Sequence, residues 1–231
     1  MEGAELKNAR EKILQTLRQS SSPASAVAPL PRPLDALIYK NYPPARQNPL
    51  QTFAQKLAAL KGEFYPVGDE LQAATVLREL LSNIPITKEA KSIARHHHEL
   101  LDRVCASDAW LAENVQIIDG QKISSPAFAE FTAGITAVDF LVARTGSIVL
   151  STATAGGRRL SVLPPLHIAV ATTAQLVFSL DEALQAFHER NASKRSSYAT
   201  IITGPSRTSD IEKILVLGAH GPKRLAVIVV G

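Results

Sequence analysis

Residues 203–212 read Thr-Gly-Pro-Ser-Arg-Thr-Ser-Asp-Ile-Glu, and this stretch is the most informative part of the sequence. An apolar run, Tyr198–Ile202, leads into it, and a helical pattern, Ile211–Leu217, follows. The order predicts a strand, a tight turn and the start of a helix. Unpaired N–H groups and a partial positive charge at a helix start favour anions. The turn therefore predicts a phosphate or carboxylate site, although capping of the helix by Ser209 and Glu212 explains part of the same pattern.

The C-terminal half is rich in apolar runs that are typical of strands. A helix predicted over Thr208–Leu217 lies between strands Tyr198–Ile202 and Leu225–Val230, which predicts a βαβ unit with a parallel pair. Residues 90–95 fit either a strand that leads into a helix over His97–Val104 or one continuous helix. The other predicted elements are strands Glu63–Val67, Val115–Ile118, Ser147–Ser151, His167–Ala171 and Gln175–Ser179, and helices Leu50–Leu60, Asp69–Leu81 (with Asp69 as N-cap) and Asp181–Phe187.

The sequence divides into an N-terminal arm, residues 1–50, and a single α/β domain, residues 51–231. Residues 4–19 have a narrow apolar face typical of a helix, and residues 20–50 hold seven of the 14 prolines. Proline lacks a donor and biases its predecessor away from helix, which indicates a linker or a wrapping arm. A helix on such an arm predicts docking on another chain or exchange between protomers, and the alternative is a loosely ordered terminus.

Composition narrows the classes of protein that the chain can represent. Cys105 is the only cysteine, so an internal disulfide and a four-thiolate cluster within one chain are excluded, and a reducing cytoplasm is expected. The sequence contains no apolar run of the 18 or more residues that a membrane-spanning helix needs. The net charge of +4 includes no dense basic stripe with aromatics, which argues against nucleic-acid binding. No metal is predicted at His96-His97-His98, because consecutive residues on a helix point in different directions.

Several glycines, hydroxyls and cationic side chains outside the opening stretch also indicate chemistry. Glycine permits positive φ and close backbone approach, and the forked guanidinium groups of Arg159 and Arg207 suit carboxylate or phosphate. His220, in a Gly-Pro loop, is the candidate for proton transfer. His167 begins an apolar strand and is predicted to be a hydrogen-bonded core or rim residue.

Five runs of sequence, taken in order, resemble the lactate-utilisation protein C family. They are Gly134-Ile-Thr-x-x-Asp139, Thr145-Gly146-Ser147, Arg159-Leu-Ser-x-Leu-Pro-x-x-His167-Ile168, Gly204-Pro-Ser-Arg-Thr-x-Asp-Ile-Glu212 and Gly218-x-His220-Gly-Pro222. The match covers about residues 130–231, is diffuse over 50–130 and is negligible before that. The resemblance implies a three-layer α/β fold with a mixed, mostly parallel sheet, similar to the sugar-phosphate isomerase, CoA-transferase and formyltetrahydrofolate cyclo-ligase group.

The same resemblance implies a part in oxidising L-lactate to pyruvate beside two partner proteins that carry iron–sulfur clusters. With one cysteine, this chain is expected to hold no cofactor of its own. One departure is Arg144, which stands where the family pattern has an acidic residue before the Thr-Gly pair. If that carboxylate serves catalysis in relatives, this member lacks the activity or binds a more anionic ligand.

Three hypotheses follow. In the first, the chain is a non-redox subunit of a lactate-oxidising system with an anion pocket formed by Thr145, Gly146, Arg159, Gly204, Ser206, Arg207, Thr208 and His220. In the second, it is an independent enzyme of the isomerase or acyl-transfer type. The sequence shows no evident nucleophile or carboxylate pair at the matched motifs, which counts against this hypothesis. In the third, it is a scaffold that acts through its arm. Whether the chain has activity alone is left open.

Overall fold

A computed structural model of the chain describes residues 9–16, 18, 48–82, 84, 92–118, 128, 130–151, 159–191, 199–208, 216–217 and 221–231. The chain forms two units, residues 1–44 and residues 45–231, and each is treated by itself. In the first unit, residues 9–16 and 18 are helical, as the sequence predicts for residues 4–19. The proline-rich segment of the arm lies outside the described residues.

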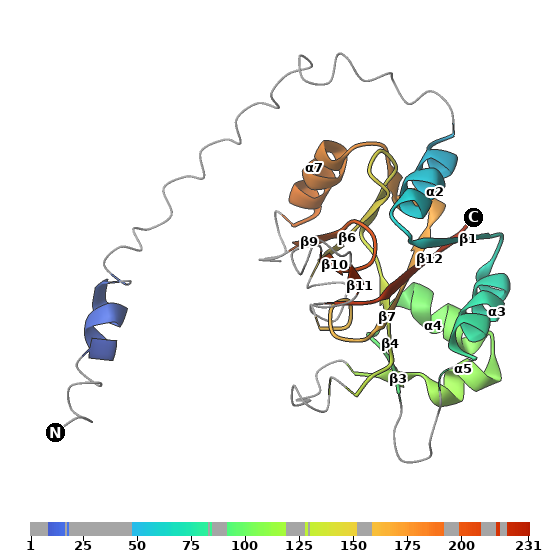
Figure 1. The fold of residues 1–231 in the computed structure, drawn as a ribbon, viewed down its shortest axis with the longest axis horizontal. Helices are drawn as coiled ribbons and strands as arrows, with labels where there is room; N and C mark the ends of the chain where they lie inside the picture. The colour runs from blue at the N-terminus through green and yellow to red at the C-terminus, as the bar shows by residue number, and fades with distance from the viewer. Residues whose placement is uncertain are drawn as a thin grey trace. The chain divides into compact units, whose positions relative to one another are not determined.

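A six-stranded parallel sheet runs through the second unit (Figure 1). Its central strands are buried on both faces, which explains their continuously apolar sequences. The order across the sheet is β1 (Glu63–Val67), β12 (Arg224–Val230), β7 (Leu166–Thr172), β4 (Ala133–Ala137), β2 (Ile93–Arg95) and β3 (Gln116–Ile117).

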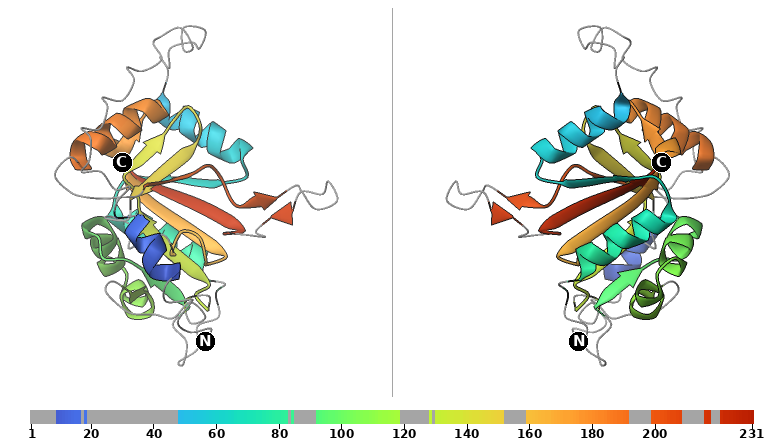
Figure 2. Two further views of the ribbon diagram at one scale, coloured as in Figure 1. Left: turned by 90° about the vertical axis from the view of Figure 1, so that its left-hand side faces the viewer. Right: turned by 90° about the vertical axis from the view of Figure 1, so that its right-hand side faces the viewer.

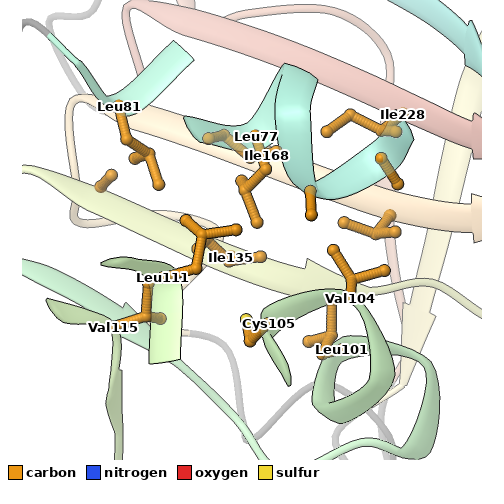
Figure 3. Close-up of a cluster of buried hydrophobic side chains, with 14 of the residues drawn as sticks. Leu77, Leu81, Leu101, Val104, Cys105, Leu111, Val115, Ile135, Ile168 and Ile228 are labelled. Atoms are coloured by element: carbon orange, nitrogen blue, oxygen red, sulfur yellow. The ribbon is translucent and has the colours of Figure 1, made fainter. Parts of the chain in front are cut away.

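Three helices cover one face of this sheet: α3 (Glu70–Leu81), α4 (Glu99–Ala106) and α5 (Ala109–Asn114). Each starts at a side-chain cap, from Asp69, His98 and Asp108 respectively, that satisfies a free N–H of the first turn. Leucines of the helices pack on alternate residues of β4, β7 and β12 (Figure 3). This cluster is the larger part of the core.

The opposite face is covered by α2 (Pro49–Ala59) and by a smaller sheet. That sheet has the order β8 (Leu176–Val177), β5 (Phe140–Val142), β6 (Ser147–Ser151) and β9 (Ala199–Ile202), and the 3₁₀ turn η1 (Thr173–Gln175) precedes β8. Helix α7 (Leu180–Asn191) packs against the outer face of this sheet (Figure 2). The predicted three-layer α/β class with a mostly parallel sheet is confirmed, and a second, smaller sheet forms part of one outer layer.

Most of the predicted elements are present. Of the two alternatives for residues 90–95, the structure has the strand followed by a helix. The strands β4 and β5 and the helix α5 were not predicted, because small residues in β4 and the short lengths of β5 and α5 weaken the periodic signal.

The predicted βαβ unit at the C-terminus is wrong. Strand β9 pairs antiparallel with β6 in the small sheet, whereas β12 lies between β1 and β7 in the large one. Where the helix was expected to begin, β10 (Arg207–Thr208) pairs antiparallel with β11 (Val216–Leu217). Residues 209–215 lie outside the described part. Cross-strand pairing overrides the local capping pattern at both ends of the segment.

Among the described residues, no helix has the length and apolar character needed to cross a membrane.

Candidate functional site

A pocket of about 260 Å³ lies beside the N-terminal ends of β7 and β12. Its wall combines hydroxyl groups, a histidine, tight turns and aliphatic side chains. The lining residues are Ser161, Val162, His167, Ile201, Ile202, Thr203, Gly204, Pro205, Ser206, Gly221, Pro222 and Leu225.

Three runs that are far apart in the sequence meet at this pocket. The turn after Arg159 contributes Ser161 and the following strand His167. Residues 204–206 and residues 221–222 complete the wall, and the Ser206 backbone N–H donates to the Pro222 carbonyl at 2.9 Å. These are runs that carry the family resemblance. The structure therefore brings them together around one cavity.

The Thr145-Gly146-Ser147 run reaches the same turn through hydroxyl groups. The Ser147 hydroxyl donates to Thr145 Oγ1 at 2.7 Å and lies 2.8 Å from Thr203 Oγ1. Because the Ser147 proton is used toward Thr145, the Thr203 hydroxyl is the donor in the second hydrogen bond. These two hydrogen bonds fix the start of the 203–206 turn against the β5–β6 turn.

Two motif glycines bring their turns against α2. Gly146 has φ +66°, and a Cβ there would lie 2.5 Å from the Leu57 backbone nitrogen. Gly204 has φ +85°, and a Cβ there would lie 2.9 Å from Leu60 Cβ. Other residues rarely adopt these φ values, and none has room. Both glycines therefore serve the docking of the pocket's turns on α2.

Gly134 on β4 positions a third turn of the pocket. A Cβ at Gly134 would lie 2.2 Å from the Leu160 carbonyl oxygen, so the absent side chain lets residues 159–163 pack onto the sheet. Leu160 is buried there, and the Val162 and Leu163 N–H groups donate to the Arg159 carbonyl. This packing presents Ser161 and Val162 to the pocket.

His167 is completely buried at the pocket wall. Its Nε2 lies 2.8 Å from Thr136 Oγ1, and its Nδ1 has no hydrogen-bond partner among the described residues. Burial lowers the pKa of His167 to about 3, so the imidazole is neutral near pH 7. The sequence predicted a hydrogen-bonded core or rim histidine, and the hydrogen bond to Thr136 confirms this. Its place in the pocket was not predicted.

The structure gathers only part of the predicted anion pocket. Gly204 and Ser206 line the cavity, and Thr145 and Gly146 lie in the turn linked to it. Arg159 and Arg207 are exposed and are not among the lining residues. The Arg159 guanidinium lies 4.4 Å from the ring centre of Phe128.

Two of the predicted residues, Thr208 and His220, lie partly or wholly outside the described residues. The Thr208 backbone belongs to β10, and its side chain is outside the described part, as is the whole of His220. The Arg144 side chain is partly exposed, and its backbone N–H donates to the Phe178 carbonyl. Their roles stay predictions.

The histidine tract has structural partners. His96 is buried, and its Nε2 accepts from the Ala137 N–H at 2.9 Å, which ties the ends of β2 and β4. His98 Nδ1 accepts from the Leu100 N–H as the cap of α4, and burial lowers the pKa of His98. His97 Nδ1 lies 2.8 Å from the Asp102 carboxylate. Within the described ranges, no group of three or more potential ligands is placed to hold a metal ion.

The chain is similar in sequence to a known domain family and to proteins from several bacteria. Residues 50–230 match the LUD domain. The chain is 30% identical over 159 residues to lactate utilization protein C from Halalkalibacterium halodurans, covering 67% of this chain and 69% of that protein. It is 37% identical over 125 residues to lactate utilization protein C from Deinococcus radiodurans, covering 53% of this chain and 58% of that protein, which is less than two thirds of its length.

A solved structure shares the fold. The crystal structure of a DUF162 family protein from Deinococcus radiodurans superposes with a TM-score of 0.58 at 21% identity. The superposition covers 79% of this chain and 96% of that one. At this identity the likeness shows the fold alone.

Proposed function

This chain belongs to the LUD domain family, and on that premise we propose that it serves lactate utilisation by holding a small anionic ligand as a non-redox component. One observation carries the proposal: runs at 159–168, 204–206 and 221–222 meet around a single pocket. A common binding role accounts for their convergence better than three separate structural roles.

The described lining of the pocket supplies neutral groups that can bind a ligand. Its described lining residues include no carboxylate, lysine, arginine or cysteine. The Ser206 hydroxyl has no hydrogen-bond partner among the described residues and is available to a ligand. The helix start that predicted an anion site is replaced at residues 207–208 by a strand. We therefore propose that hydroxyl and imidazole groups, and not a helix dipole, bind the anionic ligand.

Redox chemistry is assigned to partner proteins in this proposal. Cys105 is the only cysteine of the chain and is buried, and burial raises the pKa of its thiol. A thiolate is the form that ligates iron, so this residue is poorly suited to hold a cluster. Partner proteins with iron–sulfur clusters would supply the electron transfer from L-lactate.

Growth on lactate tests the proposed function. Deleting the gene should abolish growth on L-lactate and leave growth on pyruvate unchanged, and the full chain should restore the lost growth. A Gly204→Val chain should fail to restore it, because the side chain would collide with Leu60 at the pocket's turn. The control is Gly68→Ala, whose Cβ would lie 3.5 Å from the nearest neighbouring side-chain atom. Undiminished growth of the deletion strain on lactate would overturn the proposal.

A further inference from the structure

The hydrogen bond between Thr136 and His167 links the tautomer of the imidazole to what the pocket binds. The Thr136 hydroxyl is completely buried, and His167 Nε2 is its hydrogen-bond partner at 2.8 Å. The described residues offer the hydroxyl no second acceptor. Without a ligand, each arrangement leaves one buried donor unpaired, at about 1–3 kcal/mol: the Thr136 O–H if Nε2 carries the proton, or the Nδ1–H if Thr136 donates to Nε2. His167 lines the pocket and Thr136 is not among its described lining residues, so a ligand acceptor in the pocket can pair only with the ring. A bound acceptor therefore favours donation from Thr136 to Nε2, with the proton of the neutral ring on Nδ1.

We infer that the Nδ1–H of His167 is the anchoring donor of the pocket and binds an oxygen of a short-chain monocarboxylate. This inference rests on the proposed function for the presence of a ligand and adds the ligand's class and its polar anchor. Nδ1 is a buried ring nitrogen with no partner among the described residues, and such unpaired polar atoms are rare in folded proteins. A ligand acceptor at this position would complete the hydrogen bonding of the ring.

The rest of the pocket selects the chemical class. A carboxylate is stabilised by two or three N–H or O–H donors, and the Ser206 hydroxyl is a second donor that lines the same pocket as His167. A phosphate with two negative charges would call for cationic groups, and none of the described lining residues is cationic. Aliphatic groups from Val162, Ile202 and Leu225 surround the polar atoms and suit a short apolar substituent.

Access to Nδ1 requires a small movement of the pocket wall. His167 has no exposed surface, whereas Val162 and Ile201 at the rim are 38% and 41% exposed. A ligand therefore reaches the imidazole only after a shift of side chains in the pocket wall.

Nuclear magnetic resonance of the full chain tests the tautomer directly. Two-bond proton–nitrogen correlations of ¹⁵N-labelled protein at pH 7, recorded with saturating L-lactate or pyruvate, distinguish a ring protonated on Nδ1 from one protonated on Nε2. The Nδ1–H pattern is expected for His167, and a His167→Gln sample assigns its signals. An Nε2–H pattern would overturn the inference even if the chain functions in lactate utilisation.

Binding of L-lactate, pyruvate and inorganic phosphate to the full chain tests the ligand class. Calorimetry should show saturable binding of the two carboxylates and none of phosphate. His167→Gln keeps a polar atom near Nε2 for Thr136 but removes the Nδ1 donor, so carboxylate affinity should fall about tenfold or more. His167→Asn keeps a donor near Nδ1 and should retain more affinity than the glutamine variant. Equal carboxylate affinity of the wild-type and glutamine chains would overturn the inference.

The two proposals fail in different ways. Absent carboxylate binding to the wild-type chain, or binding of phosphate alone, overturns the ligand class and leaves the growth phenotype to decide the role in lactate utilisation. Normal growth of the deletion strain on lactate overturns that role without changing the tautomer or the binding data.

Discussion

Replacing His167 with glutamine should reduce the loss of unfolding free energy that occurs as the pH falls from 7 to 4.5. Burial lowers the pKa of His167 from 6.5 to about 3. The unfolded chain therefore binds a proton below pH 6.5 that the folded chain refuses until near pH 3, and stability falls as pH falls through this window. With about 1.36 kcal/mol per pKa unit, His167 removes about 2.5 kcal/mol from the free energy of unfolding between pH 7 and pH 4.5.

Urea unfolding at pH 7.0, 6.0, 5.0 and 4.5 measures this effect. Other groups titrate over the same range, so the quantity compared is the loss of unfolding free energy in the wild-type chain minus the loss in the variant. The expected difference is about 2.5 kcal/mol, or roughly 1 M in urea midpoint. His188→Gln, an exposed position on α7, controls for removing a histidine and should keep the wild-type loss. Equal losses in wild type and His167→Gln would refute the reasoning.

Three further predictions concern the buried residues Gly146, Cys105 and His96. Gly146→Ala should lower the free energy of unfolding by about 2–4 kcal/mol in chemical denaturation, because its Cβ would strike the α2 backbone at positive φ; Gly68→Ala should change it by less than about 1 kcal/mol, and equal effects would contradict the packing argument. Cys105 is buried with a raised pKa, so a thiol reagent should label it only after unfolding; rapid native labelling would disagree. His96→Ala should cost about 1–3 kcal/mol in thermal or urea unfolding, because the Ala137 N–H loses its acceptor, and an unchanged stability would show that the bond is dispensable.

The sequence predicts the elements well where their signals are local. Asp69 before an amphipathic run correctly predicts the cap and the start of α3, and the apolar run Leu225–Val230 predicts a buried strand. Pairing between strands is not local. The capping pattern after Arg207 favours a helix, yet Arg207 pairs with Leu217 and Thr208 with Val216, which lie further along the chain. The same limit explains why the predicted pairing of β9 with β12 is wrong.

The site is predictable in part for the same reason. Glycines mark the turns at 146 and 204, and both have the positive φ that glycine permits. His167 shows no local signal for ligand binding, because it begins an apolar strand and its significance depends on a threonine 31 residues earlier. The exposed positions of Arg159 and Arg207 could not be deduced from their side-chain chemistry, which suits an anion equally well in a pocket or at the surface.

A crystal structure of the full chain with bound L-lactate or pyruvate tests the central claim most directly. We expect the ligand in the pocket between residues 161–167, 204–206 and 221–222, with a carboxylate oxygen about 2.7–2.9 Å from His167 Nδ1. A ligand bound elsewhere on the chain, or a carboxylate in the pocket that makes no contact with Nδ1, would contradict it.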